Sequence, residues 1–494
     1  MSVAGTGFDL TGLTGRVDYY QLLDTYQLQH HLASSIWNLH SQPPLFDLWS
    51  GVLLQLPHGW IPPTMATVSI GASLVLALST YHLGRGLHLP VAAAAIITVL
   101  VVLDPANLLY SIWYFDTYPT AVALTFGALC LTRLGPEGRG RWWAAGFVTA
   151  VAAVVLGNST FQWLWLLAAV LPVLWMQRRH LRQVLIVMAL PLLVVAGWYA
   201  KNAVRFHTAT TSSWLGMNMA KVSLGTANPV ELHRLVEDGT LTPLALRRPF
   251  APLDTYAGLS APSAPTGSPV LDLPTKRNGV PNYNAASYIP ISSQYLHDDL
   301  AYVNHDPVGY ARGVSSAVRL FFFPSDRYVF LWPQARHLSA YQNAYDTVID
   351  GDIRPNDFAL VTPGDKATAP RHDRGSGPQS WDQISLTAAL AFFVLIALGP
   401  VAAWRSRTDR RWLVTMGFIW MTSAYVLVVT SLADLGENLR FRYDLGPLPL
   451  LGAAATVYAL ARRRSSPGHG GLAGGTAVET EAPHPRAGLD PITT

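Results

Sequence analysis

The sequence predicts an all-α protein that crosses a membrane several times. Hydrophobic residues make up 50% of the 494-residue chain and charged residues only 13%, whereas soluble domains carry about 25% charged residues. The mean hydropathy is +0.25. Several apolar runs reach the roughly 20 residues that an α-helix needs to cross a bilayer. These three observations indicate a polytopic bundle of transmembrane helices.

Residues 1–61 contain no apolar run of that length, and we expect them to form a loop outside the membrane. Within 45–56, apolar residues recur at the spacing of one helical face, and polar or small residues recur every four positions from Asp47. This pattern predicts an amphipathic juxtamembrane helix that lies in the membrane interface. Pro43 and Pro44 suit its start, where a missing N–H is not needed for a helical hydrogen bond.

Nine apolar segments follow, and each predicts a spanning helix. Their ranges are 62–84, 89–108, 117–134, 142–157, 160–176, 183–204, 384–404, 412–432 and 446–461. The fourth and fifth segments are short and are separated by Gly157-Asn158-Ser159, so they are either two spans or one broken helix; we favour two. The first six segments form a transmembrane module over 62–204, and the last three form a C-terminal set over 384–461.

The arginines predict which loops are cytoplasmic, because cytoplasmic loops retain positive charge. They follow every second segment: Arg85; Arg133, Arg139 and Arg141; Arg178, Arg179 and Arg182; Arg405, Arg407, Arg410 and Arg411; and Arg462 to Arg464. The remaining loops, including residues 1–61, then face outward. No upstream helix or signal peptide would carry that segment across, so we expect one further transmembrane helix ahead of it, lost through a late-called start or a trimmed sequence.

Two further segments lie outside the predicted spans. Residues 205–383 form a long extracytoplasmic segment, which we expect to be loop-like between about 225 and 300, where Pro, Gly, Ser, Asn and Tyr are frequent. The stretches 315–323 and 327–332 are more apolar, and we expect them to dock on the membrane helices. Residues 462–494 are rich in Gly, Pro, Ser and Thr and predict a disordered cytoplasmic tail.

Three groups of charged residues fall in loops assigned to the outer side. They are Asp18, followed by Tyr19 and Tyr20; Asp116, between the second and third spans; and the run Glu437-Asn438-Leu439-Arg440-Phe441-Arg442-Tyr443-Asp444. Each has an ordinary explanation on its own: a solvated loop carboxylate, a helix cap and headgroup anchors, respectively. Asp104-Pro105 also predicts a cap or turn. Two arginines in a short outer loop run against the positive-inside trend, which favours binding of a specific anion.

Together the three groups supply what a glycosyl transfer from a lipid-phosphate sugar requires. Carboxylates can accept the proton that the attacking hydroxyl loses. Guanidinium groups can stabilise the departing phosphate.

The chain resembles GT-C type membrane glycosyltransferases, in the broad group of dolichyl-phosphate-mannose protein mannosyltransferase-like and aminoarabinose-transferase-like enzymes. The resemblance covers most of 16–205 and 384–461. It rests on Asp18-Tyr19-Tyr20, His40 to Phe46, Leu103-Asp104-Pro105 leading to Asp116, Trp198 to Asn202, and Glu437 to Arg442. It implies a GT-C-like helix bundle with outer juxtamembrane helices, preceded by the same first helix that the arginine pattern requires. Only four of the 34 basic residues are lysine, a bias typical of a GC-rich genome such as that of an actinobacterium.

The resemblance also implies residue roles. Asp18 matches the family's catalytic acidic residue, as general base or as the group that orients the acceptor hydroxyl, and Asp116 matches the second acidic position. Some relatives use a lysine for the lipid phosphate where this chain has Gln42, so the expected phosphate ligands are Arg440, Arg442 and Gln42. The expected substrate pocket includes Tyr19, Tyr20, His40 and Glu437. No cofactor or metal is required, although two outer carboxylates could hold a divalent metal ion.

The expected function is the transfer of an arabinose- or mannose-class sugar from a polyprenyl-phosphate donor, with inversion. The acceptor would be a cell-envelope glycan, glycolipid or protein on the extracytoplasmic side of the plasma membrane. The alternatives are a non-catalytic scaffold and a transporter or flippase of lipid-linked sugars; transporters place charge at mid-membrane in broken helices, and these spans have almost no internal charge. Membrane lipid is an expected partner and nucleic acid is not, because no basic patch is interleaved with aromatic residues.

Overall fold

The computed structural model describes residues 21–135, 140–260, 264–350 and 384–462. Within these ranges the chain forms helices and turns, and the β-type contacts are isolated bridges such as that between Thr275 and Pro281. The predicted all-α class is therefore confirmed. Three expectations lie outside the described residues: those for residues 1–20, for the part of the long segment from 351 to 383, and for the tail beyond residue 462.

All nine predicted spans coincide with helices. Their bounds are α4 Ile61–Gly86, α5 Val91–Leu103 with α6 Pro105–Ile112, α7 Thr117–Thr132, α8 Gly140–Gly157, α9 Trp163–Met176, α10 Leu181–Phe206, α18 Leu386–Phe393 continuing through a π-helical turn to α19 Gly399–Arg405, α20 Arg410–Ala433, and α21 Asn438–Asp444 with α22 Leu448–Ala461. Among the described residues, five continuous helices are long and apolar enough to cross a membrane, or seven if each of two bent pairs is one span. The other two segments, α7 and α9, are shorter apolar helices. The fourth and fifth segments form separate helices, of which α8 is long enough to span and α9 is a shorter apolar helix; that they are two spans stays a prediction.

The first bent pair breaks at Asp104, where α5 and α6 differ in direction by 53°. Pro105 has no N–H to continue the hydrogen-bond pattern of α5. The Asp104 carboxylate instead accepts a hydrogen bond from the Ala106 N–H at 2.7 Å, which confirms its predicted role as a helix cap.

The carbonyl groups exposed at the end of α5 are satisfied by a helix from far along the chain. The Tyr345 hydroxyl in α17 (Ser339–Tyr345) donates to the carbonyl oxygen of Leu100 at 2.9 Å, and Tyr341 donates to that of Leu103. A helix end in an apolar environment needs such donors, because lipid offers none.

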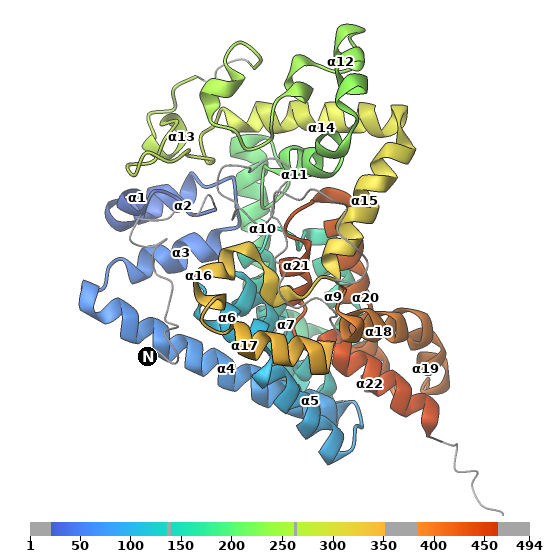
Figure 1. Cartoon of the computed structure of the whole chain (residues 1–494). Coiled ribbons are helices and arrows are strands. Elements are labelled where there is room, and N and C mark those ends of the chain that lie inside the picture. Colours follow the sequence, from blue (N-terminus) through green and yellow to red (C-terminus); the bar gives the residue numbers. More distant parts are fainter. Residues whose placement is uncertain (1–20, 136–139, 261–263, 351–383, 463–494) are drawn as a thin grey trace, which may run out of the picture.

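The segment between α10 and α18 contains a helical unit, which we call the inserted unit (residues 207–260 and 264–306). Its helices are α11 Leu215–Val222, α12 Pro229–Glu237, α13 Pro269–Asp272 and α14 Tyr288–His305. Figure 1 shows α12, α13 and α14 gathered at one end of the molecule. Its own core is rich in aromatic residues, including Trp214, Tyr256, Tyr288, Tyr295 and Tyr302.

The expectation of a loop between 225 and 300 is therefore wrong for α12 and α14, although only short turns and 3₁₀ helices lie between them apart from α13. The reason is that buried tyrosines, rather than aliphatic residues, form much of the core of this unit. Tyr288, Tyr295 and Tyr302 repeat every seven residues along α14, and all three are buried. When tyrosine is treated as a residue typical of loops, the periodic buried face of α14 is not recognised in the sequence.

The chain returns from the inserted unit to the membrane helices through α15 (Pro307–Phe321), which packs on α20 and α21. The Tyr310 hydroxyl donates to the carbonyl oxygen of Leu432 near the end of α20, at 2.8 Å. Tyr328 and Phe330 pack on the ring of Trp113, with centroid distances of 5.7 and 6.5 Å. Docking of the stretches 315–323 and 327–332 on the membrane helices is confirmed.

The predicted amphipathic helix is α3 (Pro44–Leu53), with Pro44 as its first residue. Its polar and small residues Asp47, Ser50 and Gly51 are buried, whereas Leu45, Leu48 and Val52 are 39%, 39% and 45% exposed. Helices α1 (Thr25–His30) and α2 (Leu32–Trp37) pack beside it (Figure 1). The outward apolar face suits a helix that lies against lipid.

Gly216 sets the distance between α11 and α14. A β-carbon on Gly216 would lie 1.9 Å from the backbone oxygen of Ser292 and 2.6 Å from the backbone nitrogen of Leu296. Gly216→Ala should therefore push the two helices apart and lower the unfolding temperature of the purified protein, at a cost of about 1–3 kcal/mol or more.

The matched control is Gly197→Ala in α10, where nothing lies within 4 Å of the added carbon. This variant should keep or slightly raise the unfolding temperature, because alanine favours helix over glycine. Equal effects of the two substitutions would contradict the close approach of α11 and α14.

Candidate functional site

Arg440 lies at the centre of a buried ionic cluster that joins α21 to the start of α7. Its Nε and Nη2 lie 2.9 and 2.5 Å from Oε2 of Glu437, the residue just before α21. Its Nη1 lies 3.3 Å from Oδ1 of Asp116 and 3.1 Å from Oγ1 of Thr117. The arginine is only 3% exposed, which excludes a role as a headgroup anchor in this conformation. Asp116 and the run from Glu437 to Asp444, which the sequence predicts on the same side of the membrane, are therefore in direct contact through Arg440.

Asp116 does not use its carboxylate to cap α7, although it occupies the N-cap position. Its side chain makes no capping hydrogen bond to a helix amide and instead contacts Arg440. Burial raises the pKa of Asp116 to about 6; Arg440 opposes this rise and Glu437 adds to it. The ordinary explanation of this residue as a cap is wrong, and burial makes its carboxyl group a better proton acceptor than an exposed aspartate.

A third carboxylate, Asp444, belongs to the same cluster. It lies one helical turn after Arg440, is fully buried, and its Oδ2 accepts a hydrogen bond from Nδ2 of Asn158 at 2.9 Å. Its other oxygen has no hydrogen-bond partner among the described residues. Asp444 was not among the predicted site residues, although its i, i+4 spacing to Arg440 indicates that the two side chains share one helix face. Within the described part of the chain, no group of three or more His, Cys, Asp or Glu residues is placed to hold a metal ion.

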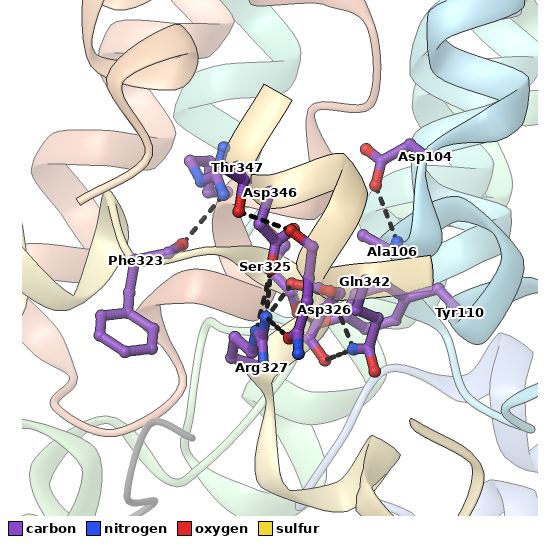
Figure 2. A network of polar contacts seen from close by, with 12 residues as sticks. Asp104, Ala106, Tyr110, Phe323, Ser325, Asp326, Arg327, Gln342, Asp346 and Thr347 are labelled. Atoms are coloured by element: carbon purple, nitrogen blue, oxygen red, sulfur yellow. Dashed lines mark hydrogen bonds and ion pairs between the residues drawn. The ribbon is translucent and has the colours of Figure 1, made fainter. Parts of the chain in front are cut away.

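Arg442 faces a second buried polar network rather than the first cluster. Its Nη2 donates to the carbonyl oxygen of Phe323 at 2.9 Å. Figure 2 shows the neighbouring side chains of Asp326, Arg327 and Gln342 converging with that of Asp346. This network was missed in the sequence, where the only signal was a charged pair directly ahead of an apolar run.

The side chains of this second network form hydrogen bonds and ion pairs with one another. Nε2 of Gln342 donates to Oδ2 of Asp326 at 2.8 Å, and Nε of Arg327 donates to Oδ2 of Asp346 at 3.1 Å. Burial raises the pKa of Asp326, and the adjacent Arg327 opposes the rise. Because its charged groups neutralise one another, we interpret the network as a structural link between the chain after α15 and α17.

His40 and Gln42 are both buried, in a segment held by the inserted unit. The Nε2 of His40 lies 2.9 Å from the carbonyl oxygen of Asn284, and Nδ1 lies 2.9 Å from the hydroxyl oxygen of Ser213. A carbonyl oxygen only accepts, so Nε2 carries the proton and Nδ1 accepts from the serine. Burial lowers the pKa of His40 to about 3, and the ring is neutral. These contacts do not bring His40 to Arg440.

Helix α3 connects the first segment of the chain to the cluster. Oδ1 of Asp47 accepts a hydrogen bond from the Leu23 N–H at 2.8 Å, and burial raises the pKa of this carboxyl group to about 7. On the other side, Ser50 Oγ lies 2.7 Å from the hydroxyl oxygen of Tyr114, and the ring of Phe46 packs on Phe115. The expected site residues Asp18, Tyr19 and Tyr20 lie outside the described residues.

Comparison with known proteins gave no match to a protein-family model, to a curated protein or to a solved structure.

The Arg440–Glu437 pair has an exposed counterpart with the same spacing, Arg234–Glu231. Arg440→Met should lower the unfolding temperature strongly, because it leaves buried carboxylates without a counter-charge, a loss of about 3–5 kcal/mol for a buried pair. Arg234→Met should leave the unfolding temperature unchanged, since exposed pairs contribute little. Thermal unfolding of both variants in the same detergent measures the difference, and a stable Arg440→Met variant would contradict the buried charge cluster.

Proposed function

We propose that the protein is a glycosyltransferase that uses a polyprenyl-phosphate sugar as donor and a cell-envelope glycan, glycolipid or protein as acceptor. The observation that carries the proposal is the cluster of Asp116, Glu437 and Asp444 around Arg440, at the ends of apolar helices. A carboxyl group whose pKa is raised by burial, as that of Asp116 is, is suited to accept a proton from a hydroxyl. The proposed side is the extracytoplasmic face of the plasma membrane, from the arginine pattern of the loops.

In the proposed reaction, the acceptor hydroxyl attacks the anomeric carbon as the bond from that carbon to the phosphate oxygen breaks. Polyprenyl phosphate leaves with the bonding electrons, and the hydroxyl proton passes to a carboxylate. Asp18 is the proposed base or orienting group, and Asp116 assists it. No cofactor takes part in this scheme.

If Arg440 binds the donor phosphate, it must first release some of its present hydrogen-bond partners. Arginine has five N–H donors, and four hydrogen bonds already join Arg440 to Glu437, Asp116 and Thr117. Arg440 could bind a phosphate fully only by giving up part of its contact with Asp116. Such an exchange would release the Asp116 carboxylate when the donor binds.

A transporter of lipid-linked sugars is the second candidate, and the two bent helix pairs favour it. Asp104 lies at one bend, and Arg440 and Asp444 lie in the short arm of the other. Transporters build substrate sites from charged residues in broken helices. Glycosyl transfer remains our first proposal, because Asp116 and Glu437 lie in the connections ahead of α7 and α21 rather than within a span. A radiolabelled polyprenyl-phosphate sugar, incubated with reconstituted vesicles and a membrane extract, distinguishes transfer to an acceptor from translocation alone.

Asp116→Asn should lower the rate of sugar transfer by about 10²–10⁴-fold, the contribution typical of a general base. The amide keeps the size of the side chain but removes one of the two carboxylate partners of buried Arg440, so the unfolding temperature should also fall. Transfer is therefore measured at a temperature at which the variant remains folded. Asp18→Asn should have the same effect on transfer, and Glu231→Gln, at an exposed ion pair, serves as the control. Full transfer activity in Asp116→Asn would exclude this residue from the reaction.

The transfer rate should rise with pH through about 6, because Asp116 accepts a proton only when ionised and its pKa is raised to about 6. Below that pH the carboxyl group is protonated; above it the rate should level off. Initial rates between pH 4.5 and 8 test the dependence, with the unfolding temperature recorded at each pH as the control. A rate that is constant between pH 5 and 7 would contradict the assignment.

A further inference from the structure

Lys201 is a buried amine that has no carboxylate partner among the described residues. Its Nζ donates to the carbonyl oxygen of Leu39 at 2.5 Å, and the ring centroids of Trp198 and Phe206 lie 3.6 and 5.2 Å away. The residue is only 8% exposed. A carbonyl oxygen and two aromatic faces stabilise an ammonium group, but they do not neutralise it. The site therefore lacks a carboxylate to balance the charge that Lys201 carries when it is protonated.

A second cation lies one helical turn further along α10. Arg205 is exposed, and its Nη2 donates to the side-chain oxygen of Asn38, the residue next to Leu39. Both cations thus contact the short segment that leads into α3. The negative end of the helix dipole favours cations in a last turn; this accounts for exposed Arg205 but not for the burial of Lys201.

The position of Lys201 along α10 matches the level of lipid phosphates. Nineteen residues separate it from Arg182 near the other end of the helix, which is about 29 Å at 1.5 Å per residue. The hydrocarbon core of a bilayer is about 30 Å thick. When Arg182 lies at one headgroup layer, Lys201 lies at the other.

One connection joins this cationic end of α10 to the carboxylate cluster. Asn158, just after α8, binds Asp444. Four residues later, Gln162 accepts a hydrogen bond from the Tyr199 hydroxyl of α10 at 2.8 Å. Arg440 is already shared between carboxylates, whereas Lys201 is not, so an anion gains more from Lys201.

We infer that Lys201, with Arg205, binds the phosphate group of a polyprenyl lipid at the end of α10. The inference rests on the proposed function for the identity of the lipid, and it moves the phosphate from Arg440 to Lys201. Binding requires no sugar and no transfer step, and it can therefore be tested separately.

The test measures binding of decaprenyl phosphate to the full chain in phosphatidylcholine nanodiscs, for example by native mass spectrometry. Lys201→Gln should weaken binding at least tenfold, and Lys201→Arg should restore most of it. Arg182→Gln, at the opposite end of the same helix, is the matched control and should bind normally. Two further measurements use decaprenol, which lacks the phosphate, as the ligand and inorganic phosphate as a competitor.

The inference is overturned if Lys201→Gln binds decaprenyl phosphate as tightly as the parent, if decaprenol binds equally well, or if Arg182→Gln loses as much. Competition by inorganic phosphate supports recognition of the phosphate itself. Weak decaprenol binding without such competition supports recognition of a phosphate carried by the lipid.

A second measurement is made on the parent chain and uses variants only to assign signals. The chain has four lysines, so ¹³C-methylation of the lysine amines gives few NMR signals, and Lys201→Arg or the other single replacements assign them. The Lys201 signal should move on addition of decaprenyl phosphate and not of decaprenol; no movement overturns the inference. Lys201-dependent binding without sugar transfer would remove the glycosyltransferase proposal alone, and transfer with Lys201-independent binding would remove the phosphate site alone.

Discussion

Arg440 carries a positive charge into a region from which water is excluded, and the surrounding chain is arranged to neutralise it. Removing a partner from a buried ion pair is costly, because the remaining charge has no solvent to stabilise it. Glu437 binds the guanidinium from the N-cap position of α21, and the contacts of Arg440 with Asp116 and Thr117 hold α7 against α21. The residues just before Asp116 pack on α3, so the positions of α3, α7 and α21 all depend on this one charge.

A second constraint acts at the helix breaks, where backbone groups lose their helical partners. Lipid cannot satisfy them, and the protein supplies the donors itself. Tyr341 and Tyr345 do this at the end of α5; at the end of α20, Nδ2 of Asn438 donates to the carbonyl oxygens of Thr430 and Asp434, both at 3.1 Å. The helices between α10 and α18 are thus structural partners of the membrane bundle.

Hydropathy was sufficient to place the apolar helices, and periodicity was sufficient to place α3, because both depend on residues that are close in sequence. The grouping of Asp116 with Arg440 came from the sidedness of the loops, which places residues on a face but cannot show which ones touch. His40 illustrates the limit: its partner Asn284 is 244 residues away, and no local pattern marks the contact. The prediction of a loop in the inserted unit was wrong because the core of this unit is rich in tyrosines. Their hydroxyl groups can be buried when they donate to backbone carbonyls, as the Tyr288 hydroxyl donates to the carbonyl oxygen of Ala251.

The wide separation of the cluster's members along the chain has a consequence for biosynthesis. Asp116 and Arg440 are 324 residues apart, and Asn158 and Asp444 are 286 apart. During synthesis, α7 and α8 are made before α21. Asp116 and Asn158 can therefore contact Arg440 and Asp444 only after α21 has been synthesised. Contacts of such long range form late and slowly. The ionic cluster is therefore one of the last parts of the protein to assemble, and a nascent chain released before α21 would retain its bundle of apolar helices but carry an unneutralised carboxylate at the start of α7.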